Sequence, residues 1–368
     1  MTRTAQLIPL CLAGWLALPA GPAQAQVVTI LHSFAGGADD GKNPSGTLTA
    51  SGSTLYGMTP SGGAAGPGTV FNINADGTGF GLLHSFAGGV NDGQNPTGSL
   101  TMSGSILYGM TQGGGSAAND GTVFRMNADG TGFSLLHSFV GGAADGSGPL
   151  GTPALSGSTL YGMTSQGSAA NLGTVFRMNA DGTGFSLLHS FDPAAGDGWA
   201  PAGSLTLSGT TLYGTTSSGG AAGDGTVFKM NADGTGYGLL HSFAGGPDDG
   251  AGPVGTLTLV GSTLYGTTPT GGANALGVLF DINTDGTGYD VLYSFAGGPN
   301  DGANPGDVIV SGSALYGMTG TGGTSNLGTV FSFPISVPEP STLALVVAGG
   351  GVAVLACRRR KPIPMSAG

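Results

Sequence analysis

The chain has 368 residues, of which 76 are glycine, 21 are proline and only 8% are charged. The glycines follow no three-residue period, which excludes collagen, and an apolar content of 39% excludes a charge-rich disordered chain. The formal net charge of −11 argues against nucleic acid and anionic membrane surfaces as partners. These limits leave an all-β protein with many turns.

The first 25 residues are organised like a secretory signal peptide. Arg3 supplies the positive start, residues 7–18 form an apolar stretch, and Ala23 and Ala25 frame a small-residue cleavage site. The apolar stretch is too short to span a bilayer. We therefore predict that residues 1–25 are removed on export.

Six repeats fill residues 26–335. A Leu-Tyr-Gly tripeptide recurs about every 52 residues, with its tyrosine at positions 56, 108, 161, 213, 265 and 316. The unit at residues 203–243 contains four short runs of β pattern, and Ser-Gly and Asn-Ala-Asp-Gly turns join them as hairpins. Four antiparallel strands in about 40–50 residues are typical of a β-propeller blade. The sequence therefore predicts a six-bladed β-propeller.

The two ends of the repeat region are offset. It begins with a strand of the fourth type, residues 27–34, and finishes with a strand of the third type, residues 329–333. We expect the N-terminal strand to complete the sixth blade and close the ring. A β-solenoid is the alternative, although its coils would gain nothing from this offset.

The C-terminal region has three consecutive parts. A Pro-Glu-Pro segment covers residues 336–341, an apolar run covers 342–357, and a basic tail covers 358–368. The run is short for a transmembrane helix but long enough if its flanking residues snorkel, and the basic tail would lie in the cytoplasm. A plain membrane anchor is the simpler alternative. The residues that mark this region are Pro338, Glu339, Pro340, Arg358, Arg359 and Arg360.

This order of parts resembles the PEP-CTERM sorting signal of exosortase substrates. The resemblance implies recognition by a membrane-embedded exosortase-type protease, a transient stay in the inner membrane, and removal of the tail. Export to the outer surface, often into an exopolysaccharide matrix, is then expected.

The repeat itself resembles the glycine-rich extracellular repeat called GloVer. The segments that carry this resemblance are LYGMT, GTVF and the DGTGF-to-LLHSF stretch, and they recur through about 300 residues. The resemblance implies an architecture, and it implies no activity.

Two sets of polar residues recur at fixed repeat positions. The histidines are His32, His84, His137, His189 and His241, with Tyr293 at the sixth position. We expect these side chains to pack as aromatics with a polar tip rather than to bind a metal, because outer strands would hold them apart. The aspartates that precede glycine in the loop entering each inner strand are Asp40, Asp92, Asp145, Asp197, Asp249 and Asp301.

Asp-Gly pairs are turn chemistry, so a conformational role is the first interpretation of these loops. Calcium binding is the alternative, because carboxylates and carbonyls are the ligands that calcium takes. Trp199 replaces a small residue in one of the loops. It could stack on a sugar ring, or it could plug the central channel.

No catalytic motif is present: the chain has neither a G-x-S-x-G elbow nor an H-E-x-x-H helix. The candidate acids are copies of one another, so nothing separates a general acid from a base. We therefore predict a non-enzymatic structural or adhesion protein of the cell surface or exopolysaccharide matrix, without a cofactor. The alternative is a glycan-binding or carbohydrate-active propeller that uses the loops around Trp199.

Overall fold

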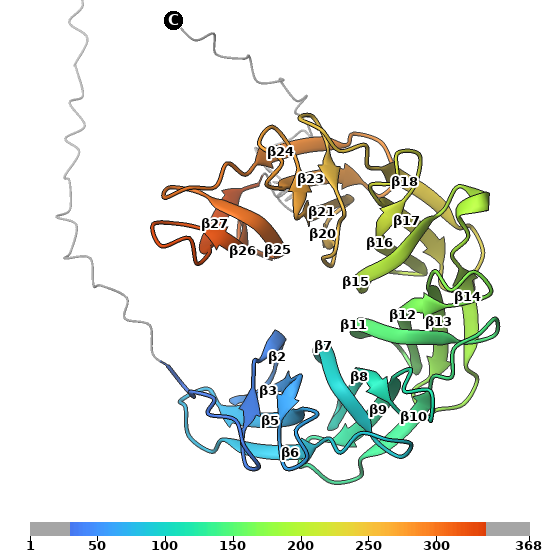
Figure 1. The fold of residues 1–368 in the computed structure, drawn as a ribbon, viewed down its shortest axis with the longest axis vertical. Helices are drawn as coiled ribbons and strands as arrows, with labels where there is room; N and C mark the ends of the chain where they lie inside the picture. The colour runs from blue at the N-terminus through green and yellow to red at the C-terminus, as the bar shows by residue number, and fades with distance from the viewer. Residues whose placement is uncertain (1–29, 336–368) are drawn as a thin grey trace, which may run out of the picture.

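The computed structural model describes residues 30–335, which form six antiparallel β-sheets arranged as a ring (Figure 1). The predicted signal peptide, sorting segment, membrane span and basic tail lie outside the described residues. Within residues 30–335 the only helical segment is the 3-10 turn η1 (Pro193–Ala195), and no helix there is long and apolar enough to cross a membrane.

Each sequence repeat supplies one blade whose strands pair in chain order. Blade 2 contains β7 (Gly93–Ser103), β8 (Ile106–Gly114), β9 (Thr122–Asn127) and β10 (Ser134–Ser138). The first strand lies next to the ring axis and the fourth lies at the periphery (Figure 1). The prediction of a propeller is confirmed, and the solenoid alternative is excluded.

The other blades repeat this pattern with small changes. Blade 1 comprises β2 (Ser45–Ser51), β3 (Thr54–Thr59), β5 (Thr69–Asn74) and β6 (Gly81–Ser85). Blade 3 comprises β11 (Gly146–Ser156), β12 (Thr159–Gly167), β13 (Thr174–Asn179) and β14 (Ser186–Ser190). Blade 4 comprises β15 (Gly198–Ser208), β16 (Thr211–Gly219), β17 (Thr226–Asn231) and β18 (Gly238–Ser242).

Blades 5 and 6 are less regular. Blade 5 comprises β20 (Thr258–Val260), β21 (Thr263–Thr268), β23 (Val278–Asn283) and β24 (Asp290–Ser294). Blade 6 has three strands, β25 (Gly302–Ser311), β26 (Ala314–Gly322) and β27 (Thr329–Pro334). Two short ladders flank blades 1 and 5: β1 (Gly41–Lys42) with β4 (Ser61–Gly62), and β19 (Gly250–Ala251) with β22 (Thr270–Gly271).

The outer hairpins of blades 1 to 5 are fixed by an Asn-x-Asp-Gly turn, in which x is alanine in blades 1 to 4 and Thr284 in blade 5. In blade 2, Asp129 Oδ1 accepts hydrogen bonds from the backbone N–H of Thr131 at 2.9 Å and from its hydroxyl at 2.7 Å. The N–H of Asn127 donates to the Thr131 carbonyl and closes the turn. The same contacts recur in the other four outer hairpins, so these aspartates have the predicted turn role.

The hydrophobic cores lie between blades. Between blades 2 and 3, Tyr108, Met110 and Phe139 pack against Leu160 and Phe176 of the next sheet. Five such clusters occur in the described residues, one for each pair of consecutive blades. Strands with apolar residues on both faces are buried in this way, because each sheet is covered by a neighbour on either side.

The structure differs from the prediction at the closure of the ring. Residues 30–34 form no strand, and no described residue pairs with the free edge of β27. Instead, His32 stacks on Phe80 at 3.7 Å and Phe34 packs edge-on against Phe71, which anchors this segment to blade 1. The side-chain contacts of a fourth strand therefore form without its backbone pairing.

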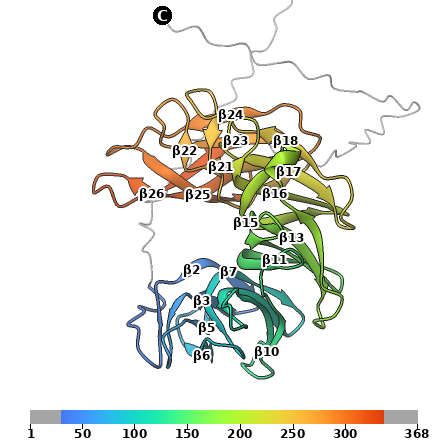
Figure 2. The ribbon, with the colours of Figure 1, turned by 45° about the vertical axis from the view of Figure 1, so that its right-hand side comes forward.

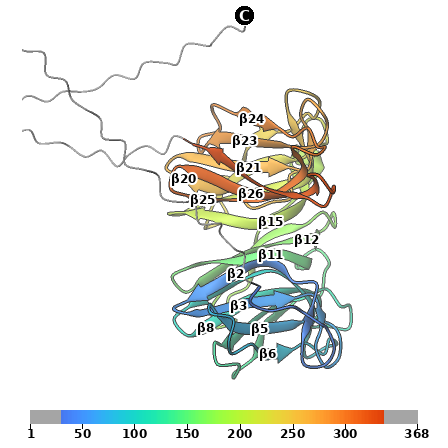
Figure 3. The ribbon, with the colours of Figure 1, turned by 90° about the vertical axis from the view of Figure 1, so that its left-hand side faces the viewer.

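Within residues 30–335, blades 1 and 6 consequently form no core cluster with each other. Leu48 on blade 1 is 51% exposed although its counterpart Leu100 is 3% exposed. On blade 6, Met318 is 66% exposed and its counterpart Met163 only 1%. Figures 2 and 3 show the blue strands of blade 1 and the orange strands of blade 6 on opposite sides of the opening.

Candidate functional site

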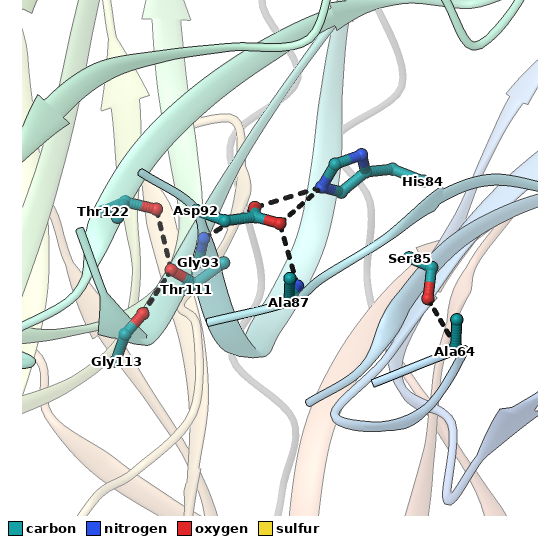
Figure 4. A network of polar contacts seen from close by, with 9 residues as sticks. All are labelled: Ala64, His84, Ser85, Ala87, Asp92, Gly93, Thr111, Gly113 and Thr122. Atoms are coloured by element: carbon teal, nitrogen blue, oxygen red, sulfur yellow. Dashed lines mark hydrogen bonds and ion pairs between the residues drawn. The ribbon is translucent and has the colours of Figure 1, made fainter. Parts of the chain in front are cut away.

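The loop aspartates form latches between consecutive units. In the best example, one Asp92 carboxylate oxygen lies 3.1 Å from His84 Nε2 and accepts the N–H of Gly93 at 2.7 Å (Figure 4). The other oxygen accepts the N–H of Ala87 at 2.8 Å. The carboxylate thus joins the outermost strand of blade 1 to the first strand of blade 2.

The histidine of each latch also contacts the following blade. The His84 ring stacks on Phe133 with centroids 3.8 Å apart and an interplanar angle of 8°. Equivalent stacks pair the other histidines with an aromatic ring of the next unit: His32 with Phe80, His137 with Phe185, His189 with Tyr237, and His241 with Tyr289. The histidines therefore pack as aromatics with a polar tip, as expected.

All six loop aspartates are held in this way. The other pairs are His32 with Asp40, His137 with Asp145, His189 with Asp197, His241 with Asp249, and Tyr293 with Asp301. In blade 5 the Tyr289 hydroxyl adds a 2.6 Å hydrogen bond to Asp249. A constant spacing of eight residues links each pair, and this was the signal in the sequence that could have revealed the latch.

The latch lowers the pKa of two of these carboxylates, Asp92 and Asp40. Burial alone would raise the pKa of Asp92, but hydrogen bonds from His84, Ala87 and Gly93 hold it below its ordinary value of 3.8. The same balance lowers the pKa of Asp40. The ionised form is therefore the form that the fold stabilises.

None of the six loop aspartates is among the residues around the ring axis. Each one is tied to the His or Tyr at the end of the preceding unit, and within residues 30–335 no three His, Cys, Asp or Glu side chains lie together as metal ligands. Calcium binding at these loops stays a prediction. The six carboxylates already accept hydrogen bonds from the fold, which calcium would have to replace or share.

The axis is instead lined by small residues of the first strands. These enclose a cavity of about 480 Å³. Around it, a backbone N–H of each of the first five units donates to a side-chain oxygen of the next unit, at 2.7–3.1 Å. The residues of this relay are Thr47, Ser99, Thr152, Ser204, Thr256 and Asp307. Burial raises the pKa of Asp307, the one carboxylate in the relay.

Trp199 lies at the start of β15, where it pairs with Ser218 on β16. Its side chain is 36% exposed, and it is not among the residues that line the axial cavity. The interpretation as a channel plug was therefore wrong. The exposed ring remains open to a ligand at the surface.

Sequence reasoning missed a polar cleft between blades 2 and 3. Its volume is about 290 Å³, and Gln94, Gln112 and Gln166 line it. These three are the only glutamines in residues 30–335. We call it the amide cleft. The restriction of glutamine to these three positions was the signal in the sequence that could have revealed it.

Two family matches agree with the repeats and with the tail. The Gloeobacter/Verrucomicrobia repeat matches residues 21–171 and 114–331, which together cover most of the chain. The chain belongs to this repeat family. The PEP-CTERM protein-sorting motif matches residues 336–361. This motif implies processing by an exosortase, a membrane protease, followed by export and display at the surface or outside the cell.

Comparisons with individual proteins add little. No curated protein sequence matches the chain. Among solved structures, a nidogen/laminin complex is similar with 16% identity and a TM-score of 0.45, over 77% of this chain and 89% of that one. A putative TolB from Agrobacterium tumefaciens has 11% identity and a TM-score of 0.43, over 79% and 90% respectively.

Proposed function

We propose that the protein is a non-enzymatic structural or adhesion component of the cell surface or of an exopolysaccharide matrix. The sorting motif supports the location at the surface. The observation that carries the non-enzymatic role is that the repeated carboxylates are hydrogen-bonded within the fold. Each loop aspartate is held by hydrogen bonds from a His or Tyr and from backbone amides, as Asp92 is by His84, Ala87 and Gly93. A carboxylate held in this way is ionised and hydrogen-bonded within the fold, so it has no proton to give to a substrate.

Hydrolysis by a carboxylate pair needs two acids in different environments, one of them with a raised pKa. The six latches provide near-identical environments, so they supply neither role. The partners that fit this proposal are an exosortase-type protease during export, the inner membrane transiently, and exopolysaccharide at the destination.

The test is an assay of the purified mature protein for turnover of host polysaccharide. We expect no release of reducing ends. Turnover that disappears in Asp92→Asn, while the variant still unfolds cooperatively, would overturn the proposal.

A glycan-binding role is the second candidate, favoured by the exposed ring of Trp199 on β15. An aromatic face can stack on the apolar face of a sugar. Binding to a glycan array that is lost in Trp199→Ala would support it, and binding unchanged in that variant would exclude Trp199.

A further inference from the structure

The amide cleft has the features of a built site. Gln94 comes from β7, Gln112 from β8 and Gln166 from β12, so two blades contribute. The fold does not ask for these amides, since other units carry unrelated residues at the same positions. For Gln94 these are Lys42, Ser147, Trp199, Ala251 and Ala303; for Gln112 they are Pro60, Ser165, Ser217, Pro269 and Gly320.

A glycine unique to this unit opens the cleft. Gly113 occupies the repeat position of Gln166, where the remaining units have Ser61, Ser218, Thr270 and Thr321. A Cβ on Gly113 would lie 2.8 Å from Gln94 Cγ and 3.1 Å from Asn119 Oδ1. A side chain at position 113 would therefore occupy the space into which Gln94 and Asn119 point.

Hydrogen bonds hold several lining residues of the cleft in place. Asn119 Oδ1 accepts the N–H of Gly114 at 2.6 Å, and Asp120 Oδ1 accepts the Ser147 hydroxyl at 2.6 Å. The buried Thr111 hydroxyl donates to the Gly113 carbonyl at 2.8 Å (Figure 4). The frame is thus held in place before any ligand arrives, which lowers the entropy cost of binding.

The glutamine amides, by contrast, are unused. None of the three makes a side-chain hydrogen bond to another described residue, whereas the surrounding Asn119, Asp120 and Ser147 do. Each amide offers two donors and a carbonyl acceptor. The cleft therefore combines a hydrogen-bonded frame with free neutral donors and acceptors, and those of Gln112 and Gln166 are exposed to solvent.

The chemistry of the lining selects the ligand class. Among the described residues that line the cleft, none is Lys or Arg, so it offers no cation to a phosphate or uronate. A sugar hydroxyl both donates and accepts, which matches amides and hydroxyls. The small volume suits a short segment of a longer chain.

We propose that the amide cleft binds a neutral polysaccharide through the hydroxyl edges of its sugars. This inference rests on the proposed surface function in one respect: only a protein displayed at the surface would meet the polysaccharide of the matrix. It identifies blades 2 and 3, rather than the ring of Trp199, as the binding position.

The test is saturation-transfer NMR on the mature protein with four neutral tetrasaccharides, of β-1,4-glucose, α-1,4-glucose, β-1,3-glucose and β-1,4-mannose. Two variants use residues that other units carry at the same positions, so the blades keep their fold. Gly113→Thr fills the cleft, and the triple variant Gln94→Ala, Gln112→Ser, Gln166→Ser removes the amides. Trp199→Ala is the control.

We expect transfer to at least one tetrasaccharide, reduced at least tenfold in both cleft variants and unchanged in Trp199→Ala. Absence of transfer to all four probes, or binding that survives both cleft variants, would overturn the inference. Binding lost only in Trp199→Ala would also overturn it. The proposed surface function is judged separately, by the turnover assay and by where the trimmed protein is found, so the two proposals can fail independently.

Discussion

Asp92 accepts hydrogen bonds from one imidazole and two backbone amides, and close variants of this arrangement recur at every unit boundary of the described chain. Hydrogen bonds to a charged acceptor are stronger than neutral ones, and an unpaired amide left behind at a blade junction is costly. The latch and the histidine stack together explain why the domain needs no disulfide between its blades.

Asp92→Asn should lower the free energy of unfolding by about 1–3 kcal/mol at pH 7, because an amide nitrogen would face the N–H of Ala87. The folded pKa of Asp92 is lowered, so its stabilisation is present above pH 3.8 and is lost as the pH falls through the folded value. The variant should therefore differ from wild type at pH 7 and approach it under acid. Urea unfolding at several pH values measures this difference.

The control for that variant is Asp39→Asn, which alters an exposed carboxylate one residue before the Asp40 latch. Equal losses of stability in Asp39→Asn and Asp92→Asn would contradict the latch.

Asp281 behaves in the opposite way. It lies across the sheet from Asp290, and burial together with that neighbouring charge raises its pKa to about 6. Between pH 3.8 and about 6 the folded state holds a proton that the unfolded state releases. Stability from this group therefore falls as the pH rises through that window.

Asp281→Asn should accordingly stabilise the protein above pH 6 and leave it unchanged near pH 4. Because the residue is partly exposed, solvent screening limits the gain to about 1–2 kcal/mol. Thermal unfolding at pH 4 and pH 7.5 is the measurement, with the exposed Asp248→Asn as control. A gain of equal size at both pH values would show that charge repulsion is not the cause.

At the scale of the element, the first strands approach one another so closely that their glycines are obligatory. A Cβ on Gly98 would lie 2.3 Å from the carbonyl carbon of Gly151 in the next blade. Gly104, in the hairpin after the same strand, also has a positive φ, of 59°, but nothing lies within 4 Å of a Cβ there. A comparison of substitutions at Gly98 and Gly104 therefore distinguishes the cost of backbone strain from the cost of a steric clash.

Gly104→Ala should cost about 1 kcal/mol, since only the left-handed backbone is strained. Gly98→Ala should cost about 2–3 kcal/mol more, because the atoms it meets belong to the backbone and cannot rotate away. Chemical denaturation of the two variants gives the comparison. Equal costs would mean that the first strands do not approach as closely as described.

The number of blades was predictable because the Leu-Tyr-Gly tripeptide recurs once in each unit. The strand order was predictable because each Asn-Ala-Asp-Gly turn is determined by residues adjacent in the sequence. The latch was not predicted, because His84 and Asp92 were each explained alone and the contact depends on how two blades pack. Within the described residues β27 has no partner at its outer edge, because residues 30–34 pack on blade 1 through contacts that no local pattern encodes. The amide cleft was missed because Gln94, Gln112 and Gln166 stand at different repeat positions.

At the scale of the whole molecule, the ring consists of five inter-blade interfaces formed by residues 30–335, with polar chemistry divided among three places. The latches at the periphery are saturated by hydrogen bonds, the axial relay is mostly hydroxyl, and the amide cleft has unused groups. We therefore predict that stability depends on packing and hydrogen bonds rather than on a bound ion.

Chelation tests this division directly. Because the loop carboxylates are already satisfied, an excess of EDTA should leave the melting temperature of the mature protein unchanged. A chelator-dependent decrease that added calcium reverses would instead establish a calcium site. Differential scanning calorimetry with and without EDTA distinguishes the two results.

The account as a whole depends on export and sorting, and one measurement tests that most directly. Intact-mass analysis of the mature protein from its own host, fraction by fraction, locates both ends of the chain. We predict a species that begins near Gln26 and ends near Pro338-Glu339-Pro340 in the surface or medium fraction. A chain that retains Arg358–Arg360 and stays in the inner membrane would contradict the account.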